Sequence, residues 1–336
     1  MQKSLTQIFN ETAEKAHDAF PLAFQAMVIF QPSADAPLYV SPEFAEHLTK
    51  NIDSVRKSMR DTGKEMERLN AAGVASPYFP VGGKVAQMIA LQDKALGYFT
   101  RGYTAEMRAV YVLDHEIGHH VVKNGRGHGP HLAEAAADAY ASLRHIQRYG
   151  QATEFFDYLN KASMVVLGQS RIHYTRDTMM RVKEFAWEQD ISQLSLQETA
   201  RLAERIAQEC HLEQRKLDKI ALAFSGAEKI YAEKLGTKNE VVAKTYAQDP
   251  AAYELFLRET LKVMQANSDA DVQRAAYEFF QYPPMKAFID NAVATNPEFE
   301  HVPATIAAAK KFADIPRVPE PPPPPRKPPT PYFDRG

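Results

Sequence analysis

Residues 110–122 read VYVLDHEIGHHVV and contain the pattern H-E-x-x-H inside an apolar stretch. The apolar residues around the polar ones predict one buried helix over Tyr111–Lys123. An α-helix turns about 100° per residue, so His115 and His119, four positions apart, share one face. Both imidazoles can then reach a single metal ion. Glu116 lies beside them, where a general base for a metal-bound water is needed.

A second helix is expected shortly after the first. Asn124-Gly125 marks a helix end, and a helical pattern resumes over His131–Tyr140 after a glycine-rich turn. Two antiparallel helices joined by a short turn result. Glu134 and Asp138 are four positions apart and share a face, and the alanines around them allow close packing against the first helix. Glu134 can therefore supply the third metal ligand.

These residues resemble the zincin metallopeptidases and, among them, the glutamate-liganded branch called gluzincins. The resemblance covers about Val112–Tyr140. It implies that Glu134 binds the metal and that Asp138 hydrogen-bonds a ligand histidine, which would also fix the tautomer of that imidazole. The H-E-x-x-H motif and the Glu134–Asp138 motif are closer together in this chain than in many gluzincins. In the alternative, aspartate-liganded branch of the zincins, Asp138 would bind the metal directly. The metzincin pattern is not met, because Val122 replaces its glycine and Gly125 its third histidine.

The expected chemistry is zinc-assisted hydrolysis of a protein or peptide substrate. Three protein ligands leave a fourth position on zinc for a water whose pKa falls to about 7. Glu116 would accept the proton of this water and pass it to the leaving amine. Zincins often stabilise the oxyanion with a later histidine or tyrosine, and His173 and Tyr174 are the first such pair after the two helices. The same pair is equally suited to brace the next helix.

Other polar residues near the motif have ordinary structural interpretations. His120 lies about 140° around the helix from His115, so it is expected to be a surface or hydrogen-bonded core residue. Asp114 is either the neighbour of a ligand or a solvated side chain. His128 and His131 lie near the glycine-rich turn, where they either contact substrate or, more commonly, are exposed.

The composition is that of an ordinary soluble protein with a sizeable core. The chain has 336 residues, 45% hydrophobic and 24% charged, with a formal net charge of -2. No basic stripe interleaved with aromatics is present, so nucleic acid is not expected as a partner. The apolar run Phe20–Phe30 is too short to span a bilayer, and no membrane partner is expected. The single Cys210 excludes an intrachain disulfide and suggests a cytoplasmic location, although export by a route without a cleaved signal would leave no mark.

The remaining patterns predict a mainly α fold with a small β component (α+β). Strands are expected near Phe24–Phe30 and Pro37–Val40, followed by one helix over Ser41–Leu69 that begins with a Ser-Pro-Glu capping sequence. Ala71–Gly83 is expected to be a loop because of its prolines and glycines. Val85–Phe99 is either the edge strand beside which zincins lay an extended peptide or another helix.

The second half of the chain reads as helical, in segments near 154–167, 176–188, 196–235, 239–266 and 270–294. We expect a zincin-like metallopeptidase core over residues 1–175 and a helical region over 176–315, which either walls the cleft or forms a module of its own. Residues 316–336 are expected to form a proline-rich, disordered tail. Its segment Pro321–Lys327 matches ligands of Src-homology-3 domains, although a plain spacer has the same composition.

Three functions are consistent with these patterns. The leading hypothesis is a zinc-dependent metallopeptidase of gluzincin type, with a helical-hairpin active site. A zinc hydrolase of a non-peptide amide would use the same site. A non-catalytic adaptor would keep the fold and act through its proline-rich tail and helical half.

Overall fold

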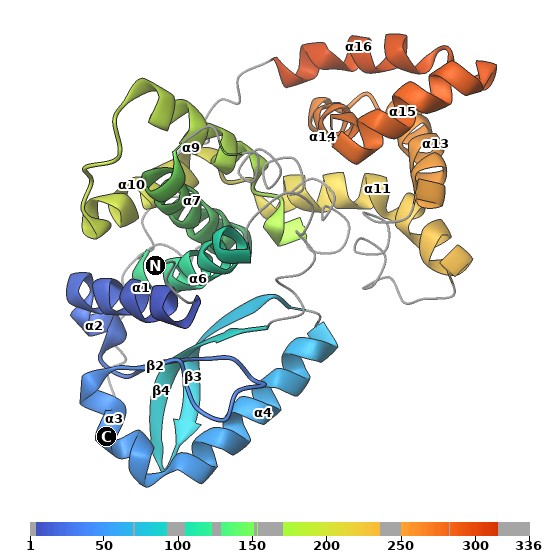
Figure 1. Cartoon of the computed structure of the whole chain (residues 1–336). Coiled ribbons are helices and arrows are strands. Elements are labelled where there is room, and N and C mark those ends of the chain that lie inside the picture. Colours follow the sequence, from blue (N-terminus) through green and yellow to red (C-terminus); the bar gives the residue numbers. More distant parts are fainter. Residues whose placement is uncertain are drawn as a thin grey trace, which may run out of the picture.

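The computed structural model describes residues 5–69, 71–92, 105–122, 129–150, 153, 171–235, 250–281 and 283–314. Within these ranges the chain is predominantly helical with one four-stranded sheet (Figure 1), which confirms the predicted fold class. The proline-rich tail, His128 and the helix expected near 154–167 lie outside the described residues. None of the helices in the described ranges combines the length and apolar character needed to cross a bilayer.

The sheet has the strand order β2-β1-β4-β3. Strand β1 (Met27–Phe30) is parallel to β4 (Lys84–Leu91) and antiparallel to β2 (Tyr39–Val40). Strand β3 (Gly73–Val81) is antiparallel to β4 and forms one edge of the sheet. The two strands expected early in the chain are therefore present in shorter form, and the ambiguous segment after them contributes β4.

The expectation of a loop over Ala71–Gly83 is wrong, because most of this segment is the edge strand β3. An edge strand tolerates proline, since it does not use every N–H group for pairing. Pro77 lies within a register shift of the β3–β4 pair. Gly82 and Gly83, with φ of 51° and 82°, form the turn into β4, and glycine adopts these angles without strain.

Each face of the sheet carries an apolar core, since alternate residues of a strand point to opposite sides and both sides pack against helices. Val28 and Phe30 of β1 pack with helices α3 (Pro42–Lys50) and α4 (Ile52–Leu69). The intervening residues of β1 pack on the other face, in a core shared with α1 (Leu5–Ala19) and the helices of the H-E-x-x-H segment. The sheet therefore lies between α4 and the helices that carry the motif (Figure 1).

The single helix expected over Ser41–Leu69 is in fact two helices, α3 and α4, which meet at Asn51. The backbone of Asn51 leaves the helical region with φ of -125°. Its side-chain amide donates a hydrogen bond of 2.8 Å to the carbonyl of His47. Asparagine often ends a helix in this way, because its side chain can replace a backbone partner.

The motif helices are α6 (Ala105–Val121) and α7 (Pro130–Tyr149), and both are longer than predicted. They pack antiparallel, as expected, because residues with increasing numbers on α6 contact residues with decreasing numbers on α7. Such pairs are Glu106 with Tyr149, Tyr111 with Ser142, and His115 with Asp138. Gly118 allows the close approach, since a Cβ there would lie 2.8 Å from the Cα of Ala137.

A second apolar core is formed by later helices. They are α11 (Gln214–Leu235), α13 (Pro250–Ala266), α14 (Ala270–Phe280), α15 (Pro283–Thr295) and α16 (Val302–Ala313). In contrast, α9 (Arg176–Glu188) and α10 (Leu196–Cys210) contribute to the first core, with α7. Residues up to Cys210 thus pack mainly in the first core and later residues in the second, whereas the predicted boundary was residue 175. The division into domains stays a prediction.

Two of the long helices predicted in the second half are interrupted. The helix expected over 196–235 ends at Cys210 and resumes at Gln214. The helix expected over 270–294 ends at Phe280 and resumes at Pro283, because a proline inside a helix removes a hydrogen bond and clashes with the preceding turn. The segment 176–188 matches α9, and α13 matches the described part of 239–266.

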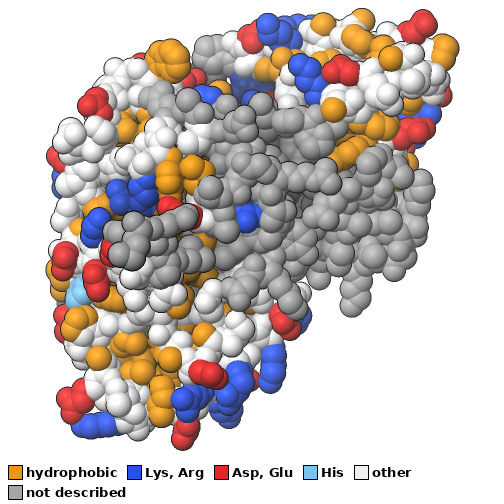
Figure 2. Space-filling view, in the orientation of Figure 1, with side chains coloured by type: hydrophobic (Ala, Val, Ile, Leu, Met, Phe, Trp, Pro, Cys, Tyr) orange, Lys and Arg blue, Asp and Glu red, His pale blue; other side chains and the backbone are white. Residues whose placement is uncertain are grey.

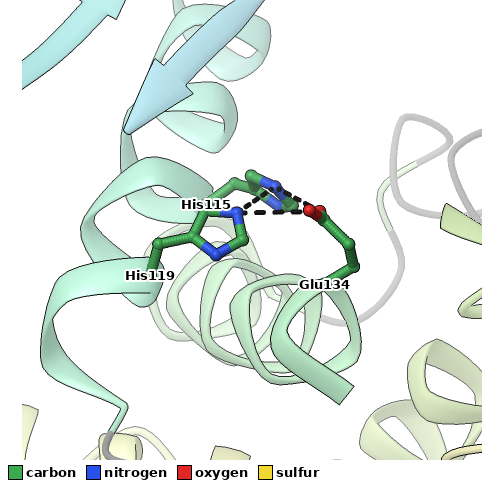
Figure 3. Close-up of side chains that lie close together, drawn as sticks. All are labelled: His115, His119 and Glu134. Carbon is green, nitrogen blue, oxygen red and sulfur yellow. Dashed lines mark hydrogen bonds and ion pairs between the residues drawn. The ribbon is translucent and has the colours of Figure 1, made fainter. Parts of the chain in front are cut away.

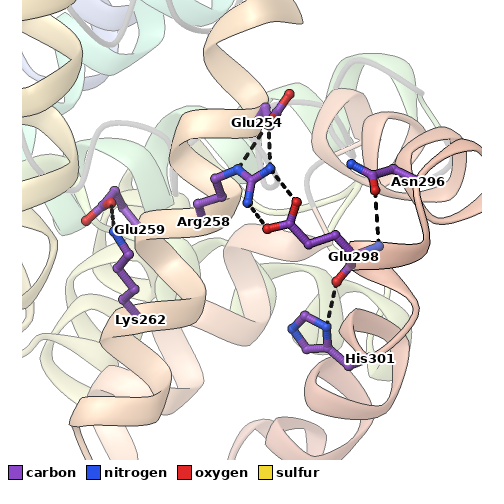
Figure 4. A network of polar contacts seen from close by, with 7 residues as sticks. All are labelled: Glu254, Arg258, Glu259, Lys262, Asn296, Glu298 and His301. Atoms are coloured by element: carbon purple, nitrogen blue, oxygen red, sulfur yellow. Dashed lines mark hydrogen bonds and ion pairs between the residues drawn. The ribbon is translucent and has the colours of Figure 1, made fainter.

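An arginine of α13 ties together the outside of the second core (Figure 4). The Arg258 guanidinium donates to Glu254 on the same helix at 2.8 Å and to Glu298 at 3.0 Å. It also lies 4.8 Å from the ring centroid of Phe299. The hydrogen bonds from Arg258 lower the pKa of Glu298. Because the pair is exposed, we expect it to add little to the stability of the fold.

Replacing Gly118 with Ala tests the contact between α6 and α7. Helix propensity alone would make this variant more stable by about 1 kcal/mol. The added methyl, however, would meet the backbone of Ala137, and overpacking of this kind costs about 1–3 kcal/mol. We therefore expect a net loss in the free energy of unfolding, measured by chemical denaturation. A gain in stability would contradict the close contact.

Candidate metal centre

Helices α6 and α7 bring three ligand-type atoms to one point (Figure 3). Both imidazoles come from α6 and point toward a carboxylate from α7. The Nε2 atoms of His115 and His119 are 3.2 Å apart. Glu134 Oε2 lies 3.3 Å from the first of these nitrogens and 3.6 Å from the second. The residues predicted to bind metal are thus placed together.

These separations fit a tetrahedral metal ion. Bonds of about 2.0–2.2 Å place the ligand atoms of a tetrahedral site about 3.3–3.6 Å apart. Glu134 Oε2 is also buried, and the imidazoles of His115, His119 and His173 surround it, the last at 3.0 Å. A buried carboxylate oxygen normally has a partner, and a cation is a suitable one here.

Asp138 occupies the orienting position that the resemblance implies. Its Oδ1 accepts a hydrogen bond from Nδ1 of His115 at 2.8 Å, which leaves Nε2 of this histidine facing Glu134. Its Oδ2 accepts a hydrogen bond from the hydroxyl of Thr175. Since both oxygens of Asp138 are engaged, the geometry favours Glu134 over Asp138 as the third ligand.

Glu116 is buried between α6 and the edge strand β3, with 6% of its surface exposed. A Cβ at Gly73 would lie 2.4 Å from its Oε1, so the carboxylate rests against the backbone at the start of β3. Burial raises the pKa of Glu116, although the nearby histidines oppose this effect. A raised pKa suits a carboxylate that has to accept a proton near neutral pH.

The structure separates the two residues predicted to stabilise an oxyanion. His173 ends the short 3-10 helix η3 (Arg171–His173), and its Nδ1 lies 3.0 Å from Glu134 Oε2, at the site. Tyr174 is 2% exposed, and its hydroxyl donates a hydrogen bond of 2.6 Å to Glu278 on α14. This placement corrects the expectation of a catalytic Tyr174, because its hydroxyl is occupied by a carboxylate of the second core. Tyr174 instead braces the chain.

Two further polar residues of α6 have structural roles. His120 is buried, and its Nε2 lies 3.3 Å from the carbonyl oxygen of Met88, which agrees with a hydrogen-bonded core residue. Asp114 is 1% exposed and forms an ion pair of 2.5 Å with Arg148 of α7. A buried carboxylate is stable only when paired, so this contact also fixes α6 against α7.

His131 neither reaches the site nor is exposed, which corrects both interpretations of this residue. It is 4% exposed, at the start of α7. Its Nδ1 accepts a hydrogen bond of 3.2 Å from the backbone N–H of Leu212, so its Nε2 carries the proton. This Nε2 donates to the carbonyl of Tyr174 at 2.9 Å. His131 therefore joins α7 to the segment that carries His173.

The charges of the site are strongly coupled. Burial opposes the ionised forms of both His115 and Glu134. The carboxylates of Asp138 and Glu134 outweigh this effect and hold the pKa of His115 well above its usual value. In the same way, the imidazoles around Glu134 hold its pKa well below the usual range. Hydrogen bonding to Glu134 also raises the pKa of His173 against the effect of burial.

Three residues were missed by the analysis of the sequence: Gly73 and Thr175, which contact residues of the site, and Glu278, which contacts Tyr174 beside it. None of them belongs to a motif. Thr175 lies two positions after His173, and this proximity is a weak indication of a place near the site. Gly73 lies in the segment that was expected to be a loop, so its contact with Glu116 was not foreseen. Glu278 lies more than a hundred positions from the H-E-x-x-H segment, and only the packing of α14 brings it near.

The Asp138→Asn substitution tests the coupling of His115 in the metal-free protein. Removing this charge should lower the pKa of His115 toward 6.5, as measured by NMR titration of its ring protons. Because folding raises the pKa of His115, the contact with Asp138 contributes its full stabilisation below pH 6.5. This stabilisation is lost as the pH rises through the pKa of His115 in the folded protein. Asp61→Asn, on the exposed face of α4, is the matched control. Identical titration curves would contradict the contact.

Comparisons with models of protein families, with curated proteins and with solved structures find no match to this chain. The resemblance to gluzincins is neither shown nor contradicted by them. It rests on the H-E-x-x-H residues of α6 and on Glu134 and Asp138 of α7.

Proposed function

We propose that this protein is a zinc-dependent metallopeptidase. The observation that carries the proposal is the triangle formed by His115, His119 and Glu134, whose sides match a tetrahedral ion. Two imidazoles and one carboxylate are a donor set of catalytic zinc sites, in which the fourth position is open. Bound zinc would supply a water of lowered pKa and would polarise the carbonyl of the substrate.

The protein's own residues would divide the remaining work. Glu116 lies next to the ligand histidines in the helix, and its raised pKa suits the acceptance of a proton from the attacking water. Asp138 holds His115 in the tautomer that presents Nε2. His173, beside Glu134, would donate a hydrogen bond to the oxyanion that develops on the substrate.

The edge strand β3 supports a peptide substrate over a non-peptide amide. An extended peptide can add to the edge of a sheet, where main-chain hydrogen bonds hold it. The start of β3 lies against the carboxylate of Glu116, so a peptide paired there would pass close to the base. Pro77 and Pro80 lack N–H groups, which restricts full pairing to the first part of β3, Gly73–Ser76.

The partners and location belong to the same proposal. On the face seen in Figure 2, the described Lys and Arg side chains are interspersed with Asp and Glu, which agrees with a protein substrate rather than nucleic acid. A cytoplasmic location is suggested by the single Cys210. Binding of Pro321–Lys327 to a Src-homology-3 domain rests on the sequence alone.

Two substitutions in the site test the proposal. Glu116→Gln should retain zinc and lower kcat for an unstructured protein substrate by at least about 10²- to 10⁴-fold, the usual contribution of a general base. Glu134→Ala should lose zinc after dialysis against a weak chelator, as measured by elemental analysis. Glu106→Gln, a matched change on the same helix, should keep both zinc and activity.

Four outcomes would contradict the proposal. Zinc binding without cleavage by the wild type would favour an amide hydrolase or an adaptor. Cleavage that persists in Glu116→Gln would exclude this residue as the base. Absence of zinc from the wild type, or unchanged zinc content in Glu134→Ala, would contradict the ligand set.

Gly73→Ala tests the position of the base without touching the ligands. The new methyl would occupy the place of the Glu116 carboxylate, which would have to move. A displacement of about 1 Å can lower a rate about a hundredfold, so kcat should fall to this extent with zinc content unchanged. Gly83→Ala strains the same hairpin, but its Cβ would meet nothing within 4 Å, so it should retain activity. Equal activity of the two variants would contradict the contact.

A further inference from the structure

Four consecutive residues, His173 to Arg176, join the candidate metal centre to the second core. Their side chains alternate in direction. His173 contacts Glu134 and Thr175 contacts Asp138, both on α7. The intervening Tyr174 and Arg176 both contact Glu278 on α14. One short segment therefore carries contacts to both sides.

Glu278 holds the side of this segment that faces the second core. Only 3% of its surface is exposed. Its Oε2 accepts a hydrogen bond of 2.6 Å from the hydroxyl of Tyr174, and its Oε1 pairs with the guanidinium of Arg176 at 2.5 Å. A buried carboxylate with a charged and a neutral donor is held in one geometry, because losing either donor leaves a buried charge poorly compensated.

The same segment is also fixed from the side of α7. His131 donates a hydrogen bond to the carbonyl oxygen of Tyr174 and accepts one from the backbone of Leu212, just after α10. The main chain at Tyr174 is thus held by α7, and its side chain by α14. This leaves His173 and Thr175 little freedom to move away from the ligand and orienting carboxylates.

We propose that Glu278 is a positioning residue, which holds His173 and Thr175 against the metal centre and makes the second core a working part of the site. This inference rests on the proposed function. Glu278 itself does not touch the reacting atoms and acts through Tyr174 and Arg176. The helical region after α10, which forms the second apolar core, is then required for activity.

The test compares full-length Glu278→Gln with the wild type. The amide keeps the shape of the side chain but removes the charge that pairs with Arg176. We expect faster carbethoxylation of His173 by diethyl pyrocarbonate, followed by mass spectrometry, with the exposed His301 as internal reference. In the zinc-loaded enzyme, kcat should fall about ten- to a hundredfold with little change in KM, because the lost contact acts in the transition state.

Two further variants separate positioning from general destabilisation. Glu259→Gln makes the same change on α13 of the same core, where its partner is the exposed Lys262, and it should leave both labelling and kcat unchanged. Tyr174→Phe removes one hydrogen bond and keeps the ion pair of Glu278, so it should show a smaller effect in the same direction. It also serves as the test if Glu278→Gln does not fold.

The readouts distinguish this inference from the proposed function. If the wild type binds no zinc and cleaves no peptide, the proposed function fails, but labelling of His173 in the metal-free protein still decides the positioning. Wild-type labelling of His173 in both folded Glu278→Gln and Tyr174→Phe would overturn the inference. Equal losses in Glu259→Gln would also overturn it, because the effect would then belong to the stability of the core.

Discussion

The close packing of α6 on α7 at Gly118 is the constraint on which the rest of the candidate site depends. The carboxylate inside the motif, Glu116, faces Gly73 at the start of β3, and the third atom of the triangle comes from Glu134 on the neighbouring helix. Gly118 and the alanines of α7 bring the two backbones close enough for Glu134 to reach both rings. Asp138, one turn further along α7, then accepts a hydrogen bond from Nδ1 of His115.

The sequence predicts well those features that arise from local periodicity and spacing. The H-E-x-x-H pattern and the pair Glu134 and Asp138 lie on helices of known pitch, so their relative positions follow from geometry. The segment Ala71–Gly83 could not be predicted in this way. Its prolines and glycines are typical of a loop, and only pairing with β4 makes it a strand.

The contacts that complete the site depend on tertiary structure, which a single sequence does not reveal. Tyr174 is as plausible a catalytic group as His173 when only the order of residues is known. The two differ because adjacent side chains of an irregular segment point in opposite directions, one to Glu134 and the other to Glu278. Glu278 could not be found from the sequence, since nothing in α14 marks this one acidic residue among its neighbours.

The parallel pairing of β1 with β4 has a consequence for how the chain folds. Met27 pairs with Gln87, so two strands (β2 and β3) and two helices (α3 and α4) lie between the two partners along the chain. Closing so long a loop costs entropy before any pairing is gained, and such contacts form slowly. The face of the sheet on which α6 docks thus depends on a long-range pairing, and the support of α6 and α7 is complete only when this pairing has formed.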